Sequence, residues 1–455
     1  MRHLATLLCA TLGLLAACST VPEYDDTGSR AVGTTGGPRI IGTSGPLSAR
    51  QSKALLDRLV SEPGEAGLLQ RHTAVEQAVA ESPLIAGNRT QLLRDGPASF
   101  AAIFAAIRNA RNNVNLEYYT FEDVTSGGET LGDLLVAKRQ AGVVVNVLYD
   151  SYGSRGTPTA FLDRLKQAGV SLLVFNPLDP LDTRVPYAPN DRDHRKILIA
   201  DGRTAVVGGV NLSTKYESHP PEGATEEHWR DTDIQIDGPV VAQLQRLFVD
   251  HWNAQHGPPF AEAAYFPTIP PDGTEVIRIL GSTPDHAIPR YYVTLLSAIR
   301  TAEKSITISA AYFVPTHQEM EDLLGAARRG VVVRILLPDR SDWAWAISVA
   351  HSHYADLLEA GVTIYETHGI VLHTKTVTID GVWSVLGSSN FDKRSILFND
   401  EVDAMVLGSA TAQALQQMFE EDIAKANRID PAAWSRRPLS QKLRDLLART
   451  WDTLL

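Results

Sequence analysis

The sequence of 455 residues contains only two cysteines, Cys9 and Cys18, and both lie near its start. Long apolar runs are also scarce, since no stretch of about 18 apolar residues follows residue 17, the length that a membrane-spanning helix needs. Basic residues are fewer than acidic ones, 42 against 53, and the net charge is −11. This balance, with no basic tail, argues against a nucleic-acid partner, because binding many phosphates requires many Lys and Arg side chains.

The first 18 residues, MRHLATLLCATLGLLAAC, have the pattern of a targeting segment. Arg2 supplies a positive charge, and the apolar run that follows is short for a bilayer-spanning helix. Residues 15–18, LAAC, resemble a bacterial lipobox, in which the cysteine is lipidated and becomes the mature N-terminus. We therefore expect a signal peptide over residues 1–17 and a lipid on Cys18, with a plain secretory signal as the alternative. No disulfide could then form within one mature chain.

This interpretation predicts a lipid-anchored protein on the periplasmic side of a bacterial cell envelope. Ser19, rather than Asp, follows the lipobox cysteine, and by resemblance to sorted bacterial lipoproteins this favours the outer membrane over the inner one. Residues 19–46 are rich in Gly, Ser, Thr and Pro, which is typical of a flexible linker. Two helices are expected near residues 47–61 and 66–81, so that 18–85 forms one N-terminal segment.

The rest of the chain repeats itself. Residues 100–121, 134–150 and 161–176 match residues 293–313, 323–339 and 354–368, each match pairing a helix with a buried strand. Ile107 and Ile299 are offset by the same 192 residues as Gly169 and Gly361. Alternating helices and apolar strands predict an α/β fold with parallel or mixed sheets flanked by helices. We expect two similar lobes, at residues 86–262 and 263–430.

A second repeat carries the chemistry. RDHRKILIADGRTAVVGGVN (192–211) aligns with VLHTKTVTIDGVWSVLGSSN (371–390), and each copy contains His-x-Lys-x4-Asp followed by an Asp-Gly hairpin turn. The motif residues are His194, Lys196 and Asp201 in the first copy, and His373, Lys375 and Asp380 in the second. Burying a histidine and a lysine in a strand costs several kcal/mol unless they are paired or used. The repetition therefore indicates a functional site.

Each motif supplies half of a phosphate site. Its histidine can act as nucleophile or acid, and its lysine and the asparagine that ends the hairpin, Asn211 or Asn390, can hold phosphate oxygens. Ser388 either donates to the phosphate as well or caps a turn. Two histidines suit a double displacement in which one attacks phosphorus and the other protonates the leaving group. With two lysines stabilising the charge, we expect neither a metal nor another cofactor.

These paired motifs resemble those of the phospholipase D superfamily, and the resemblance covers residues 86–427. It implies two lobes related by a pseudo-twofold axis, with both histidines at their interface. It also implies that His194 is the nucleophile, forming a phosphohistidine, and that His373 is the general acid and base. Asp231 and Glu401 match the carboxylates that, in this family, lie downstream of each motif and orient its histidine. Asp201 and Asp380 fall at the turns and are expected to be structural supports.

Within the superfamily, residues 193–213 and 228–252 most resemble bacterial cardiolipin synthases. This implies transfer of a phosphatidyl group from one phospholipid, phosphatidylglycerol or another donor, to the hydroxyl of phosphatidylglycerol or a related acceptor. Hydrolysis to phosphatidic acid is the alternative, and a nuclease is disfavoured by the charge and the expected anchor. The sequence departs from the best-known members in lacking N-terminal transmembrane helices, whose role a lipid anchor would take.

Two features are left open. Tyr118, Tyr119, Tyr312 and Phe313 end their strands and either line the cleft or belong to the core. At the C-terminus, residues 431–455 are expected to contain an amphipathic helix with one apolar face. That face comprises Leu439, Leu443, Leu446, Leu447, Trp451 and Leu454. It either docks on the second lobe or inserts into an anionic lipid surface.

Overall fold

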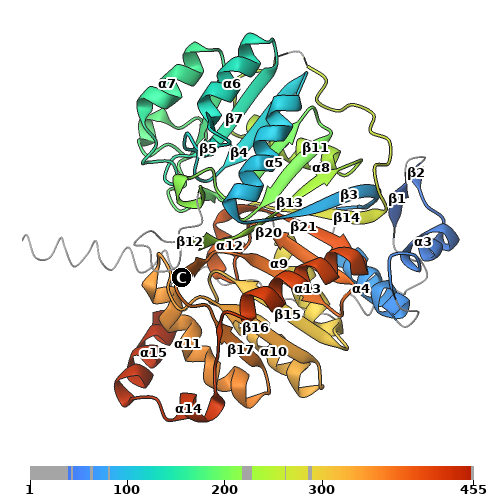
Figure 1. Ribbon diagram of the computed structural model, residues 1–455, viewed down its shortest axis with the longest axis vertical. Coiled ribbons are helices and arrows are strands. Elements are labelled where there is room, and N and C mark those ends of the chain that lie inside the picture. The colour runs from blue at the N-terminus through green and yellow to red at the C-terminus, as the bar shows by residue number, and fades with distance from the viewer. Residues whose placement is uncertain are drawn as a thin grey trace, which may run out of the picture.

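The computed structural model describes residues 39–42, 45–61, 65–79, 82–217, 228–261, 263–284 and 289–451. The expected signal peptide, Cys18 and most of the expected linker lie outside these residues, as does Leu454. Two lobes are stacked on each other in Figure 1, the first in cyan and green and the second in yellow to red.

Each lobe contains one mixed sheet, and the two sheets have the same strand order. The first sheet consists of β8 (Ser171–Phe175), β7 (Val144–Asp150), β4 (Asn113–Tyr118), β10 (Lys196–Ala200), β11 (Thr204–Gly208), β13 (Thr232–Asp237) and part of β3 (Leu84–Arg94). The second consists of β17 (Thr363–Glu366), β16 (Val332–Leu337), β15 (Ser305–Ala310), β19 (Lys375–Ile379), β20 (Trp383–Gly387), β21 (Asn399–Leu407) and β14 (Glu275–Ser282). The first three strands of each are parallel and the others antiparallel. The predicted duplicated α/β fold is confirmed.

Equivalent helices flank the two sheets. The first lobe has α5 (Asp95–Asn109), α6 (Leu131–Gln140), α7 (Thr159–Gln167) and α8 (Val241–Ala254). The second has α9 (Arg290–Thr301), α10 (His317–Arg328), α11 (Ala344–Glu359) and α13 (Ser409–Ile423). Gly169 and Gly361 follow α7 and α11 with φ of +86° and +94°, a conformation that glycine adopts without steric cost and that commonly ends a helix. The duplicated Gly signals therefore mark equivalent helix ends.

The strand β3 joins the two lobes. Its beginning pairs with β14 of the second sheet, for example Ile85 with Ile277, and its end pairs with β13 of the first, for example Arg94 with Thr232. A shared apolar core contains side chains of both sheets, among them Ile197 and Ile279. This continuous backbone pairing and shared core fix the relative position of the two motifs.

The N-terminal segment packs on the second lobe. The helices α3 (Ala49–Leu56) and α4 (Glu65–Val79) fall where the sequence predicted two helices. The prediction of a linker over residues 19–46 is wrong at its end, since β1 (Ile40–Gly42) pairs with β3 and with β2 (Gly45–Pro46). The physical reason is the apolar side chain of Ile40, which is fully buried in the second lobe's core.

The C-terminal residues form α14 (Pro431–Ser435) and α15 (Leu439–Trp451), which lie beside α11 at the bottom of Figure 1. In α15, Asp445 and Ala448 are buried, and Asp445 pairs with Arg437 at 3.2 Å. A row of leucines one turn apart stays exposed, by 81%, 57% and 55% for Leu439, Leu443 and Leu447. The helix therefore contacts α11 through Ala448, which packs with Val349, while these three members of the expected apolar face stay exposed. Among the described residues, no helix is both long and apolar enough to cross a bilayer.

Candidate active site

Both motifs open onto one cavity of about 780 Å³ between the lobes. His194 and His373 line it, together with Asn211 and Asn390. Each histidine follows a short strand, β9 (Arg192–Asp193) or β18 (Ile370–Leu372), and precedes the motif strand β10 or β19. The structure thus brings together the two histidines and two asparagines that the sequence selected from positions 179 residues apart.

The short strands pair with the opposite lobe. The strand β9 pairs with β21 of the second lobe, and β18 pairs with β12 (His228–Arg230) of the first. The backbone N–H of His194 donates to the carbonyl of Asp400 at 2.9 Å, and that of His373 donates to the carbonyl of Arg230 at 2.7 Å. Each histidine backbone is therefore fixed by the lobe that it does not belong to.

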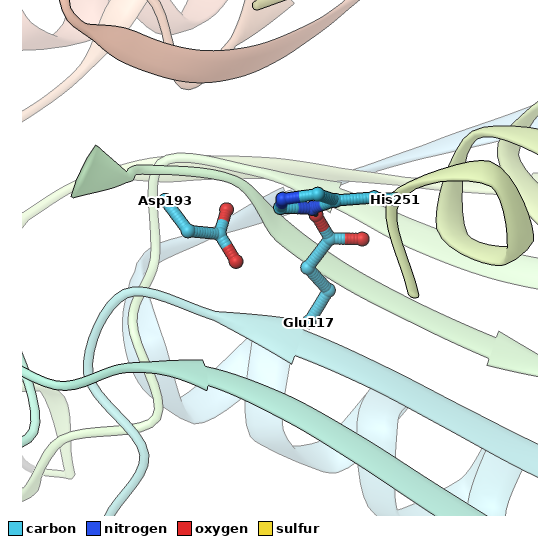
Figure 2. Close-up of side chains that lie close together, drawn as sticks. All are labelled: Glu117, Asp193 and His251. Carbon is cyan, nitrogen blue, oxygen red and sulfur yellow. The ribbon is translucent and has the colours of Figure 1, made fainter. Parts of the chain in front are cut away.

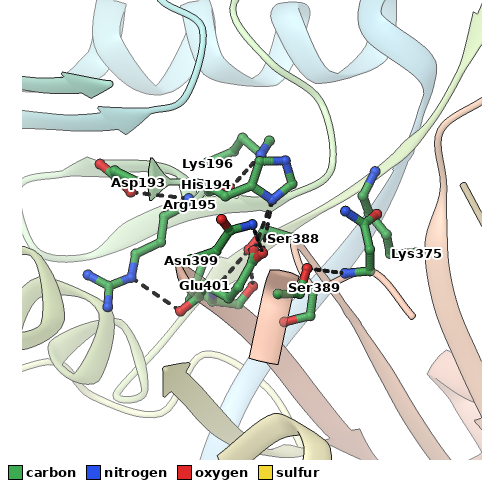
Figure 3. A network of polar contacts seen from close by, with 12 residues as sticks. Asp193, His194, Arg195, Lys196, Lys375, Ser388, Ser389, Asn399 and Glu401 are labelled. Atoms are coloured by element: carbon green, nitrogen blue, oxygen red, sulfur yellow. Dashed lines mark hydrogen bonds and ion pairs between the residues drawn. The ribbon is translucent and has the colours of Figure 1, made fainter. Parts of the chain in front are cut away.

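The carboxylates that face the histidines are also exchanged between the lobes. His194 Nδ1 lies 3.1 and 3.0 Å from the two carboxylate oxygens of Glu401, as Figure 3 shows. His373 Nδ1 lies 2.6 Å from Oδ2 of Asp231. The expectation that each carboxylate orients the histidine of its own motif is therefore wrong. The reason is that β9 and β18 cross to the partner lobe and carry their histidines with them.

Ser388 lies behind Glu401 instead of facing the cavity. Its hydroxyl donates to Glu401 Oε2 at 2.5 Å, and the amide of Asn399 donates to Oε1 at 3.0 Å. The serine is fully buried, so the expectation that it binds phosphate does not agree with its position. Because donors hold both oxygens of Glu401, this carboxylate has one fixed orientation toward His194.

Both motif lysines are buried beside their histidines. Lys196 Nζ donates to the carbonyl of His194, and Lys375 Nζ lies 2.9 and 3.1 Å from the two ring nitrogens of His373. Burial lowers the pKa of Lys196 to about 7, although Glu401 opposes this effect, and burial also lowers the pKa of Lys375. An anionic phosphate in the cavity would raise both pKa values again, so the two ammonium groups are suited to hold it.

The two histidines are neutral at pH 7. Burial lowers the pKa of His194 to about 4, and the nearby charge of Glu401 only partly opposes this. Burial and the charge of Lys375 likewise lower the pKa of His373, against the effect of Asp231. A neutral imidazole is a nucleophile, whereas a general acid needs a proton, which the negative charge of a bound phosphate would favour.

Asp201 and Asp380 lie at the turns, away from the cavity. Asp201 accepts hydrogen bonds from the backbone N–H groups of residues 111, 112 and 113, and Asp380 from those of residues 303, 304 and 305. Asp380 also contacts His72 Nε2 of α4 at 3.1 Å. Each aspartate therefore ties its hairpin to the loop before the neighbouring strand, a position that suits a structural role.

The glycines before the asparagines make room for a second pair of carboxylates. A Cβ on Gly208 would lie 2.2 Å from Asp233 Oδ1, and one on Gly387 would lie 2.3 Å from Asp403 Oδ1. Burial raises the pKa of Asp233 to about 7 and that of Asp403 to about 8. Each glycine therefore leaves space for a buried carboxylate of the neighbouring strand.

A buried polar cluster on the far side of the first motif was missed in the sequence. Arg195 lies between His194 and Lys196 and donates to Glu117 at 3.1 Å, to the carbonyl of Ser282 at 3.0 Å and to the carbonyl of Glu401 at 3.2 Å. It therefore joins both lobes behind the histidine. Strand alternation was the available signal, because Arg195 had to point away from its two motif neighbours.

Three side chains of the same cluster are close enough together to hold a metal ion. Carboxylate oxygens of Glu117 and Asp193 and a ring nitrogen of His251 lie within 4.8 Å of one another (Figure 2). Arg195 already neutralises Glu117, and His251 Nδ1 contacts the same carboxylate at 2.7 Å. None of the three lines the cavity, so a cation held here would not reach a phosphate between the histidines.

Aromatic rings surround both histidines. The ring centroid of Tyr119 lies 5.2 Å from that of His194, while those of Trp229 and Tyr312 lie 5.5 and 6.2 Å from that of His373. The sequence left open whether the four aromatic residues at strand ends line the cleft or belong to the core, and the structure shows two in each position. Tyr119 and Tyr312 line the cavity, whereas the two remaining candidates, Tyr118 and Phe313, are buried in the cores of their lobes.

Comparisons with known proteins match this arrangement. A family model described as "Cardiolipin synthase, PLD-like domain" matches residues 103–252 and 295–423, one segment in each lobe. The cardiolipin synthase of Geobacillus kaustophilus is 31% identical over 409 residues, 89% of this chain and 79% of that protein. The major cardiolipin synthase of Bacillus subtilis is 31% identical over 372 residues, 81% and 76% of the two chains. A crystal structure of phosphatidylserine synthase from Haemophilus influenzae shares the fold, with a TM-score of 0.61 at 14% identity, and covers 84% of this chain and 97% of that one.

Proposed function

This chain belongs to the cardiolipin synthase family of the phospholipase D superfamily, and we propose that it joins two phosphatidylglycerol molecules into cardiolipin and glycerol. The observation that carries the proposal is the pair of histidines in one cavity, each held through Nδ1 by a carboxylate. With Nδ1 engaged, each histidine presents Nε2 to the phosphate, and Lys375 Nζ lies 3.1 Å from this nitrogen of His373. Two such groups, one on each side of a phosphorus atom, are what a double displacement requires.

In the first step, His194 Nε2 attacks the phosphorus of the donor lipid. A nitrogen–phosphorus bond forms while the bond to the glycerol oxygen breaks, and His373 donates a proton to that oxygen. Glu401 keeps the proton of His194 on Nδ1, so that Nε2 has its lone pair free. Lys196 and Lys375 stabilise the negative charge that gathers on the phosphate oxygens in the transition state. Asn211 and Asn390, which also line the cavity, would donate to the same oxygens.

In the second step, a hydroxyl group of another phosphatidylglycerol gives its proton to His373 and attacks the phosphorus. The nitrogen–phosphorus bond breaks, His194 leaves with its lone pair, and cardiolipin is released. His373 has then regained the proton that it lost in the first step. Water could attack the same phosphohistidine and give phosphatidic acid, so the acceptor decides between transfer and hydrolysis.

The site is proposed to act at a membrane surface. Lipidation of Cys18 would hold the enzyme on the periplasmic side of the envelope. Because Ser19 follows this cysteine, the outer membrane is favoured over the inner one. The exposed leucine row of α15, with the neighbouring Arg436, Lys442 and Arg444, would add a weaker contact with anionic lipid. Labelling cells with a radioactive fatty acid would test the anchor. Loss of the label in Cys18→Ser would support it, and an unlabelled wild-type protein would overturn it.

The enzymatic proposal is tested by incubating the purified full-length protein with phosphatidylglycerol vesicles and analysing the lipids by mass spectrometry. Cardiolipin and free glycerol are expected in equal amounts. We expect His194→Ala and His373→Ala each to lower this rate by about 10²–10⁴-fold, the usual effect of losing an acid–base group. Phosphatidic acid as the sole product would establish the hydrolase instead, and unchanged lipids would contradict both activities.

A further inference from the structure

The rims of the cavity beside the two histidines carry different charged groups. On the His194 side, the guanidinium of Arg155 lies over the Tyr152 ring at 4.3 Å, and Arg394 donates to the carbonyl of Asn190 at 2.8 Å. On the His373 side, Lys215 and Asp342 line the cavity. The two halves of the site repeat in their motifs, but they do not repeat at these rims.

The reaction geometry assigns the acceptor to the His373 side. In an in-line displacement the attacking and leaving groups lie on opposite sides of phosphorus. Because His194 occupies one side in the phosphohistidine, both the departing glycerol and the incoming hydroxyl must lie beside His373. Groups on this rim therefore contact the headgroup of the acceptor lipid, which contains a glycerol and, beyond it, a second phosphate.

Lys215 is placed to bind that second phosphate. It lies in the short helix η2 (Thr214–Tyr216), and its ammonium group is held over the Trp229 ring at 4.8 Å from the centroid. Trp229 in turn lies beside His373, with 5.5 Å between the ring centroids. The lysine is exposed and lines the cavity, so a ligand can reach it. The Trp229 ring contacts both side chains and therefore sets the distance between Lys215 and His373.

Asp342 offers the complementary group for a hydroxyl. Its carboxylate accepts hydrogen bonds from the Tyr312 hydroxyl at 2.6 Å and from the Ser341 hydroxyl at 3.2 Å. Although burial alone would raise the pKa of Asp342, the hydrogen bonds from Tyr312 and Ser341 and the charge of Lys215 lower it, so the group is ionised at pH 7. An ionised carboxylate accepts a hydrogen bond from a glycerol hydroxyl and repels a phosphate.

We propose that Lys215, held over Trp229, binds the phosphate of the acceptor phospholipid, while Asp342 accepts a hydrogen bond from its glycerol. This inference rests on the proposed phosphatidyl transfer and names the residues that select its acceptor. Free glycerol and water lack the second phosphate, and the donor lipid uses its only phosphate for the reaction itself. Lys215 therefore favours transfer to a phospholipid over transfer to glycerol or water, without contributing to formation of the phosphohistidine.

The test measures how one phosphohistidine is divided among three acceptors. Phosphatidylglycerol vesicles are incubated with the full-length enzyme and deuterated glycerol, and the products are resolved by mass. Transfer to lipid gives cardiolipin, transfer to glycerol gives deuterated phosphatidylglycerol, and hydrolysis gives phosphatidic acid. These ratios do not depend on how much enzyme is folded or on the rate of the first step.

In Lys215→Gln, the ratio of cardiolipin to deuterated phosphatidylglycerol should fall about tenfold, the effect of one charge-assisted hydrogen bond at an exposed site. Lys215→Arg should restore most of it. Arg155→Gln is the matched control, because Arg155 is also an exposed cation over an aromatic ring of the cavity, and it should leave the ratio within about twofold. Asp342→Asn should lower both transfer products relative to phosphatidic acid.

An unchanged ratio in Lys215→Gln, with a wild-type enzyme that makes cardiolipin, would overturn the role of Lys215 alone. A fall in Arg155→Gln instead would place the acceptor phosphate on the His194 side and would also overturn it. If Asp342→Asn kept the wild-type proportion of phosphatidic acid, the role of Asp342 would be refuted. A wild-type enzyme that makes no cardiolipin would contradict the proposed function itself, an outcome distinct from all three.

Discussion

Replacing Glu401 by glutamine should disable His194 without changing the volume of the side chain. Glu401 is fully buried, and both of its carboxylate oxygens lie within 3.1 Å of His194 Nδ1. A glutamine can turn its NH2 group toward Nδ1, which then accepts a hydrogen bond and leaves the ring proton on Nε2. In that tautomer the nitrogen that faces the phosphate has no free lone pair.

The loss of the negative charge of Glu401 also makes His194 less reactive. Burial already lowers the pKa of His194 from the ordinary 6.5 to about 4, which corresponds to about 3 kcal/mol against the protonated, positively charged ring. The charge of Glu401 opposes this effect, so its removal lowers the basicity of the imidazole further. Positive charge also develops on the ring as the nitrogen–phosphorus bond forms. Together, the wrong tautomer and the lost charge should reduce kcat/KM by about 10²–10⁴-fold.

The assay is the initial rate of glycerol release from phosphatidylglycerol vesicles, normalised to folded protein by circular dichroism. Ser388→Ala is the matched control, since it removes one hydrogen bond to Glu401 but keeps the charge and the contact with His194. Its expected loss is about tenfold. If Glu401→Gln retained a tenth of the wild-type rate, or if Ser388→Ala were the more damaging change, the orienting role of Glu401 would be refuted.

Four further outcomes follow from the same contacts. His194 must be neutral to attack, and burial lowers its pKa to about 4, so kcat/KM should decline on the acid side near pH 4. A decline near pH 6.5 would contradict the lowered pKa of His194. With a nitrophenyl phosphodiester, whose leaving group needs no proton, His373→Ala should still release a burst of nitrophenol and His194→Ala should not; the reverse result would exchange the two roles. Asp380→Asn should lower the free energy of unfolding at pH 7 by about 1–3 kcal/mol, measured with urea. Burial alone would raise the pKa of Asp380, but His72 and three backbone N–H groups lower it. The stabilisation is therefore present above the unfolded-state pKa near 4 and is lost as the pH falls through the folded-state pKa. If the difference in unfolding free energy between the wild type and Asp380→Asn did not become smaller in acid, this account would be contradicted. Dialysis against a chelator should leave the transfer rate unchanged, and a loss restored by a divalent ion would contradict the metal-free mechanism.

The features that could be predicted from the sequence were those that depend on local residue patterns. The helix and strand periodicities, the Gly signals at 169 and 361 and the repeated motif all depend on neighbouring residues, so they indicated the duplicated fold directly. The same patterns selected the two histidines that share the cavity. Ile40 shows the limit of this approach, because two apolar residues in a Gly-rich segment carry too little signal to predict a strand.

The features that could not be predicted depend on contacts between the lobes. Nothing near His194 in the sequence indicates that its carboxylate lies 207 residues away, because β9 pairs with a strand of the other lobe. The position of Ser388 depends on a contact within the second lobe, where β20 pairs with β21 and brings the serine hydroxyl to Glu401. Arg195 was overlooked because a charged residue between two motif residues gave no sign of its buried partners, Glu117 and the carbonyl of Ser282.

The exchange of carboxylates also has a consequence for the newly made chain. A ribosome completes the first lobe, with His194, before it reaches Glu401, and Asp231 is made before His373 exists. An isolated first lobe therefore contains one histidine and one carboxylate that do not belong together. Each histidine meets its carboxylate only when the two lobes are folded against each other. The orientation of both catalytic rings is therefore a property of the complete two-lobed enzyme and of neither lobe alone.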